Sequence, residues 1–218
     1  MLLPLAAHVP AVARAYGIPR RLPRTDAAAL TFDDGPHPEG TPAVLDALDA
    51  VGAKATFFLM GEQVDRRPEL AREIAARGHA IGVHGYRHTL LLRRTRRALA
   101  DDLDRAAALI GNATGAAPVY YRAPYGVFST ASLALARERG WIPLLWSRWG
   151  RDWERRATGE AIARRAGGRL AGGDVVLLHD ADYYSSAGSW RRTVEALPAI
   201  LATGSTLELS WVPLTHET

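Results

Sequence analysis

The stretch Leu30-Thr31-Phe32-Asp33-Asp34-Gly35-Pro36 decides the fold, because a short apolar run ends there in two adjacent carboxylates and a Gly-Pro turn. This pattern predicts a buried strand that delivers acids to a loop. Neighbouring strand side chains point to opposite faces, so both aspartates can serve one site only if the backbone turns directly after them. The alternative for an isolated Asp-Asp-Gly is an Asx-type turn with solvated acids.

Strand and helix alternate about seven times along the 218 residues, which predicts a parallel sheet covered by helices, either doubly wound or closed as a barrel. The 48% hydrophobic content is enough for the core of one large domain, expected over 27–218 after an N-terminal lead-in over 1–26. Strands are expected at 27–33, 55–60, 79–84, 119–122, 141–147 and 174–178. Helices are expected at 41–51 with Thr41 as N-cap, 68–77, 95–110, 130–139, 158–170 and 189–201.

Polar clusters follow the ends of these strands. In parallel α/β barrels the chemistry lies at the carboxyl ends of the strands. The residues found at such ends are Asp33, Asp34, His84, Arg122 and His179. We therefore expect one site built from several strands.

A metal is expected at this site. The chain has no cysteine, so only histidine and carboxylate ligands are available. His84 and His88 are four residues apart, a spacing that presents both imidazoles to one ion from a helical turn, although many such pairs are incidental. With Asp34 they form a triad that leaves positions open for water and substrate. We expect zinc (Zn2+), with Co2+, Ni2+ or Mn2+ as alternatives.

Three further features point to the same edge. His179 ends the last apolar strand, where it could also be a core histidine with satisfied hydrogen bonds. Arg122 supplies a fixed cation that could hold a nearby aspartate ionised as a general base. Trp146, Trp149 and Trp153 are either core filler or an aromatic wall suited to sugar or acyl groups.

These motifs resemble, in order and spacing, those of the polysaccharide deacetylases of carbohydrate esterase family 4, the NodB homology domain. The motifs are Thr31-Phe32-Asp33-Asp34-Gly35-Pro36, the His84 and His88 pair, Arg122-Ala123-Pro124-Tyr125-Gly126, Asp152-Trp153 and Leu177-Leu178-His179-Asp180. The resemblance covers about residues 27–204 and implies a distorted (β/α) barrel with about seven repeats. It also implies metal-dependent hydrolysis of an N-acetyl, less often O-acetyl, group on a sugar.

The resemblance also implies a role for each matching residue. Asp33 would be the general base, oriented by Arg122, and His179 the general acid. The metal ligands would be Asp34, His84 and His88. The Tyr125 backbone N–H would help hold the oxyanion, and the acetyl pocket would be lined by Trp153 and Leu177.

The chain departs from the family pattern in three places. Gly85 and Thr89 stand where the family usually has Ser or Thr and Pro, which favours a looser histidine loop. The loop over 181–190 is unlike that of the common chitin and peptidoglycan enzymes. Trp149 replaces a usual aspartate, so we assign Asp152 the role of tuning His179; the alternative is that Asp152 caps the following turn.

The charge and the N-terminus bear on partners and location. The formal net charge is +4, but the cluster over 93–97 has no interleaved aromatic residues and no nucleic-acid motif, so we expect no nucleic-acid partner. The apolar segment over 1–15 lacks a basic start and is too short to span a membrane. We expect a cytoplasmic monomer, or an extracellular protein if a leader has been removed.

Three functions follow as hypotheses. The first is an N-deacetylase acting on an acetylated amino sugar or its polymer, chitin-like or peptidoglycan-like. The second applies the same chemistry to a small or lipid-linked N-acetyl or N-formyl precursor. The third is a catalytically silent glycan-binding module. The complete set of metal ligands, base and acid argues against this third hypothesis.

Overall fold

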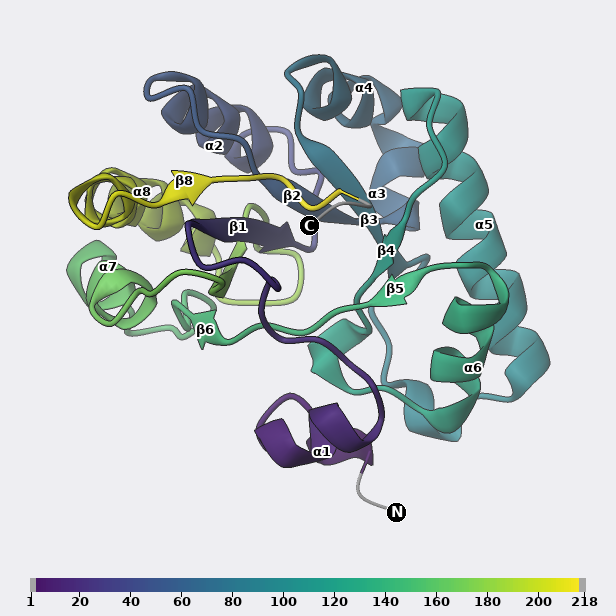
Figure 1. Cartoon of the computed structure of the whole chain (residues 1–218). Coiled ribbons are helices and arrows are strands. Elements are labelled where there is room, and N and C mark those ends of the chain that lie inside the picture. The colour runs from purple at the N-terminus through teal and green to yellow at the C-terminus, as the bar shows by residue number, and fades with distance from the viewer. Residues whose placement is uncertain (1–2, 216–218) are drawn as a thin grey trace.

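A curled parallel sheet surrounded by helices forms the fold in the computed structural model, which describes residues 3–215 (Figure 1). The strands are β1 (Ala27–Asp33), β2 (Thr56–Met60), β3 (Ala80–Gly85), β4 (Tyr120–Tyr121), β5 (Ile142–Pro143), β6 (Arg148–Trp149), β7 (Val175–His179) and β8 (Ser210–Trp211). Their order is β5-β4-β3-β2-β1-β7-β6, with β8 also paired to β1, and all of these ladders are parallel. This is the distorted barrel that the sequence predicts.

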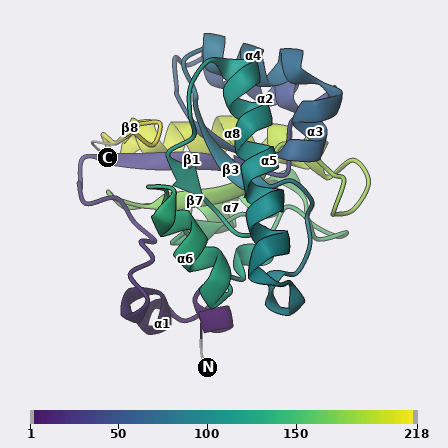
Figure 2. The same ribbon diagram turned by 90° about the vertical axis from the view of Figure 1, so that its right-hand side faces the viewer.

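Helices cover the outside of the sheet, as the two perpendicular views show (Figures 1 and 2). They are α1 (Pro10–Ala15), α2 (Gly40–Asp49), α3 (Gly61–Arg66), α4 (Pro68–Ala76), α5 (Arg96–Thr114), α6 (Thr130–Glu138), α7 (Gly159–Gly167) and α8 (Ser189–Thr206), with short 3-10 turns η1 (Leu3–Leu5), η2 (Leu91–Arg93) and η3 (Pro124–Gly126). Hydroxyl N-caps begin three of them: Thr95 for α5, Ser129 for α6 and Thr158 for α7. Within residues 3–215, every helix is too short or too polar to cross a bilayer.

Strand β1 lies at the centre of the sheet, and all seven of its residues are buried. It runs between β2 and β7, so its continuous apolar run packs on both faces. The register with β7 pairs Asp33 with His179. Two residues that are 146 positions apart in the chain are thus brought to the same end of neighbouring strands.

The barrel is open between β5 and β6, where the sequence predicted one strand over 141–147. That prediction is wrong because the carbonyls in the middle of this segment bind side chains. The oxygens of Leu144 and Leu145 accept hydrogen bonds from the buried Arg122 guanidinium at 3.3 and 3.2 Å. The lead-in packs against this open edge: the Leu145 N–H donates to the Pro19 carbonyl oxygen at 2.9 Å, and the Arg20 guanidinium donates to the Trp146 carbonyl oxygen at 2.8 Å.

Two other expectations also need correction. Helix α2 begins at Gly40, and Thr41 does not cap it. The Thr41 hydroxyl instead accepts a hydrogen bond from the His37 N–H at 2.7 Å and donates to the buried Asp180. Helices α1 and α3 and strand β8 were not predicted, because each is short and depends on tertiary packing rather than on a periodic pattern. Residues 1–2 and 216–218 of the expected lead-in and domain lie outside the described residues.

Candidate active site

A cavity of about 430 Å³ opens at the carboxyl ends of the central strands. Eight of the ten predicted site residues line it: Asp33, Asp34, His84, His88, Tyr125, Trp153, Leu177 and His179. The remaining two lie directly behind it, where Arg122 contacts Asp33 and Asp152 contacts His179. All ten predicted residues therefore belong to one site.

The two aspartates are buried, so the alternative of solvated acids is wrong. Strand β1 ends at Asp33, and Asp34 has a φ of 81°, the left-handed conformation that turns the chain. The Arg122 guanidinium donates to Asp33 Oδ1 at 2.7 Å and to the Thr31 hydroxyl at 2.8 Å. The fully buried Arg122 guanidinium thus holds one oxygen of the Asp33 carboxylate in place. The other oxygen is directed to the cavity.

Asp34, His84 and His88 form a group that fits a divalent ion. One donor atom from each lies within 4.8 Å of the others, and Asp34 Oδ1 is 3.4 Å from Nε2 of both histidines. Asp34 Oδ1 is buried and has no hydrogen-bond partner among the described residues. An unpaired carboxylate oxygen between two imidazole nitrogens is the arrangement that a cation satisfies.

The protonation states of this group also suit a metal. Burial disfavours the charged form of Asp34, but the close approach of the His84 imidazole and the charges of the nearby histidines outweigh it and lower its pKa to about 2. Burial lowers the pKa of His88 to about 4, against the attraction of Asp34. An ionised carboxylate and a neutral imidazole are the forms that bind metal.

The loop that carries the two histidines is not the helical turn that the spacing suggested. Strand β3 ends at Gly85, whose φ of 113° turns the chain, and His88 follows a bend at residues 86–87. Helix α5 holds the loop, because Asp102 accepts a hydrogen bond from the Tyr86 N–H at 2.7 Å and pairs with Arg94, which also donates to Thr89. These contacts hold the loop in place, and the looser loop that Gly85 and Thr89 favour stays a prediction.

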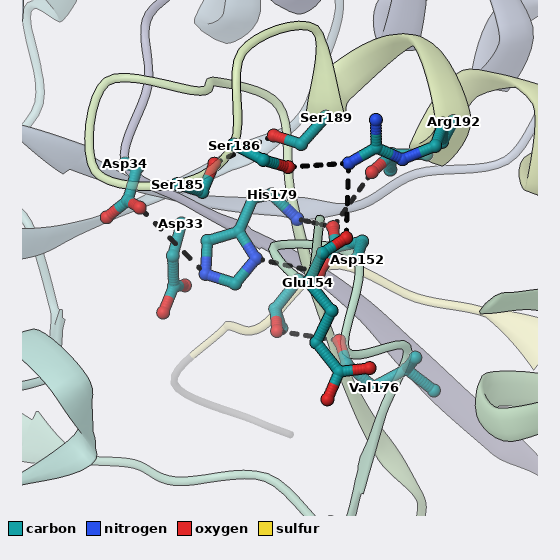
Figure 3. A network of polar contacts seen from close by, with 12 residues as sticks. Asp33, Asp34, Asp152, Glu154, Val176, His179, Ser185, Ser186, Ser189 and Arg192 are labelled. Carbon is teal, nitrogen blue, oxygen red and sulfur yellow. Dashed lines mark hydrogen bonds and ion pairs between the residues drawn. The ribbon is translucent and has the colours of Figure 1, made fainter. Parts of the chain in front are cut away.

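The His179 imidazole lies between the carboxylates of Asp34 and Asp152 (Figure 3). Its Nδ1 donates to Asp152 Oδ1 at 2.9 Å, and its Nε2 lies 3.9 Å from Asp34 Oδ2. Burial opposes protonation, but the Asp152 carboxylate prevails and raises the pKa of His179 to about 10. This is a protonated ring with one N–H directed to the cavity, not a core histidine.

Asp152 does not cap a turn. Its carboxylate is fully buried and accepts hydrogen bonds from the His179 N–H at 2.7 Å and the Thr193 hydroxyl at 2.8 Å. These contacts hold the carboxylate against the imidazole. Thr193 was missed by sequence reasoning, since nothing distinguishes it from other polar residues of α8.

A row of aromatic rings leads away from His179. Between ring centroids, Trp153 lies 5.4 Å from His179, and Trp149 lies 5.6 Å from Trp153. Two further rings contact Trp149: Trp146 at 5.7 Å and His8 at 5.6 Å. All of them line the cavity, and the tryptophans also pack in or against the core, so both expected roles are observed. The sequence carried no signal for His8.

One cavity at the ends of parallel strands is surrounded by three kinds of group: a candidate general base, a triad of two histidines and one carboxylate, and a protonated histidine. This combination defines a class: α/β-barrel hydrolases that act with a bound divalent ion.

The chain belongs to the polysaccharide deacetylase family, whose sequence profile matches residues 21–142. It is 34% identical over 173 residues to a peptidoglycan-N-acetylglucosamine deacetylase of Bacillus cereus, covering 79% of this chain and 61% of that protein. It is also 34% identical over 190 residues to a chitooligosaccharide deacetylase of Azorhizobium caulinodans, covering 82% of this chain and 90% of the relative.

Solved structures agree with the family. A crystal structure of a peptidoglycan N-acetylglucosamine deacetylase matches with a TM-score of 0.85 and 30% identity, covering 93% of this chain and 92% of that one. A family 4 carbohydrate esterase from Streptomyces lividans, in complex with acetate, matches with a TM-score of 0.79 and 27% identity, covering 88% and 95% of the two chains. The seven-repeat barrel is thereby confirmed.

Proposed function

We propose that this protein hydrolyses the N-acetyl group of an acetylated amino sugar or of its oligomer or polymer. The observation that carries the proposal is that Asp33, held by Arg122, and His179, held by Asp152, both face the cavity that the metal triad lines. The names of the relatives support a peptidoglycan-like or chitin-like substrate. The complete set of polar groups argues against a silent glycan-binding module.

The residues divide the work of amide hydrolysis between them. Asp34, His84 and His88 would hold a divalent ion, which would supply the Lewis-acid chemistry that polarises an amide carbonyl and acidifies water. Asp33 accepts the proton as the water oxygen bonds to the carbonyl carbon, and His179 Nε2 donates a proton to the nitrogen as the C–N bond breaks. The products are acetate and a free amine.

The remaining lining residues position the substrate. Trp153 and Leu177 supply apolar surface for the acetyl methyl group beside His179. The Tyr125 N–H is assigned to the carbonyl oxygen as its charge develops. The half-buried Trp149 offers a ring face to the sugar, in the place of the aspartate that is usual in the family.

Product analysis tests the proposal. Purified metal-loaded protein should release acetate from chitooligosaccharides or peptidoglycan fragments, with one new amine per acetate. Release of formate from small N-formyl amines alone would favour the second hypothesis, a small or lipid-linked precursor. Saturable glycan binding without any release would identify a silent module. Cytoplasmic location and a monomeric state stay predictions.

The Asp152→Asn variant is expected to shift the alkaline limb of the pH–rate profile to lower pH. Because Asp152 raises the pKa of His179, its loss lets His179 lose its proton earlier as the pH rises, and the general acid is then missing. The measurement is kcat/KM against pH in metal-loaded enzyme. Asp182→Asn, which changes a carboxylate that faces His37 instead, is the control. An unshifted limb in Asp152→Asn would show that another group tunes His179.

A further inference from the structure

The two histidines of the triad are held in different ways. The His84 Nδ1–H donates to the Arg122 carbonyl oxygen at 2.8 Å, which leaves Nε2 for the metal. The Nδ1 atom of His88 is buried and has no hydrogen-bond partner among the described residues. Metal-binding histidines almost always use such a partner to fix the ring. Something else must therefore orient His88.

Aromatic rings surround His88 in place of a hydrogen bond. The Tyr184 ring lies parallel to the imidazole, with ring centroids 4.4 Å apart and an angle of 12° between the planes. Tyr125 contacts the same imidazole edge to face at 4.3 Å. Tyr184 is the more restrictive contact, because a parallel stack resists tilting of the ring out of its plane.

Tyr184 is itself anchored. Its hydroxyl donates to the Glu62 carboxylate at the start of α3. The Glu62 backbone N–H in turn donates to the Tyr86 carbonyl oxygen at 3.0 Å, within the histidine loop. Glu62 thus joins the Tyr184 ring to the segment that carries His88. This connection holds the Tyr184 ring in place against the His88 imidazole.

We propose that Tyr184 is a positioning residue for the metal ligand His88, acting by stacking in place of the missing hydrogen bond. The inference rests on the proposed metal site. It assigns a role to the loop over 181–188, which the sequence singled out only as unusual. It also makes metal affinity depend on a residue outside the triad.

Other contacts also hold the loop over 181–188, which makes the proposal testable by substitution. Asp182 accepts a hydrogen bond from the Gly188 N–H at 2.6 Å. The side chains of Ser185 and Ser189 bond to each other at 2.7 Å, and Ser186 accepts from Arg192 at 2.7 Å (Figure 3). None of these contacts involves the Tyr184 side chain.

The experiment is a zinc titration of metal-free protein by calorimetry at fixed pH. Tyr184→Ala should raise the zinc Kd about tenfold, the lower end of the effect of losing a group that orients a ligand. Tyr184→Phe keeps the ring and should stay close to wild type. The matched control is Tyr183→Ala: Tyr183 lies in the same loop, 6.2 Å from Tyr184 between ring centroids, but its other contacts are with His37 and Arg67 rather than with His88.

Each outcome decides a separate point. A Tyr184→Ala zinc Kd within twofold of wild type would overturn the inference and leave the proposed function intact. If Tyr184→Phe were as weak as Tyr184→Ala, the hydroxyl bond to Glu62 rather than the stack would hold the site. An equal loss in Tyr183→Ala would point to the loop as a whole. Wild-type protein that binds no zinc would overturn both the inference and the metal site.

Discussion

The His84→Ala variant is expected to lose its metal and, with it, essentially all deacetylase activity. His84 is one of three ligands, and its removal leaves two donors, too few to hold a catalytic ion. Polarisation of the carbonyl by such an ion contributes several kcal/mol, so the rate should fall by roughly a thousandfold or more. Metal content and acetate release, measured on the same preparation, check this result.

Two controls separate metal loss from misfolding. Chelation of wild-type protein should abolish activity, and added metal should restore it in wild type but not in His84→Ala. His79→Ala removes another buried histidine, at the opposite end of strand β3, and should keep the metal. Full activity of metal-free wild-type protein would contradict the assignment of the triad.

The Asp33→Asn variant is expected to retain metal and lose most turnover. Asparagine keeps the shape of the side chain and can still accept a hydrogen bond from Arg122, but it cannot take a proton from water. Loss of a general base costs roughly two to four orders of magnitude in rate. The measurement is kcat in metal-loaded variant, with metal content determined in parallel.

Folding and ligand identity must be checked in this variant. Arg122 is fully buried, and an unpaired buried charge destabilises a protein by about 3–5 kcal/mol, so unfolding should be followed by denaturant titration. Asp34→Asn is the matched variant and should lose the metal. If Asp33→Asn lost the metal and Asp34→Asn kept it, the roles of the two aspartates would be reversed.

Sequence reasoning succeeded where a residue's role follows from its place on a strand. Because parallel strands bring their carboxyl ends to one edge, the position of Asp33 and His179 at strand ends was enough to predict that they meet. The helices expected over 95–110 and 158–170 were equally local signals, and both are observed, each beginning one residue later than expected because Thr95 and Thr158 act as N-caps.

Prediction from the sequence failed where a side chain from a distant segment occupies the hydrogen-bonding groups that would otherwise form local secondary structure. The segment over 141–147 has the apolar pattern of a strand, yet Arg122 binds its carbonyls and interrupts the ladder. Thr41 was expected to cap a helix, yet it lies within α2 and its hydroxyl donates to Asp180. Asp180 is 139 positions from Thr41, and Arg122 is 22 positions from Leu144, so no local pattern could reveal these contacts.

The sequence by itself predicted the barrel and the residues that gather at its cavity, because strand periodicity and motif spacing are encoded locally; the metal, base and acid roles of these residues stay predictions. Only the tertiary structure decided how these groups are held. Thr193 holds Asp152 against His179, and Tyr184 stacks on His88, through contacts between segments 41 and 96 residues apart. Such contacts depend on side-chain packing in three dimensions, which no spacing along the chain specifies.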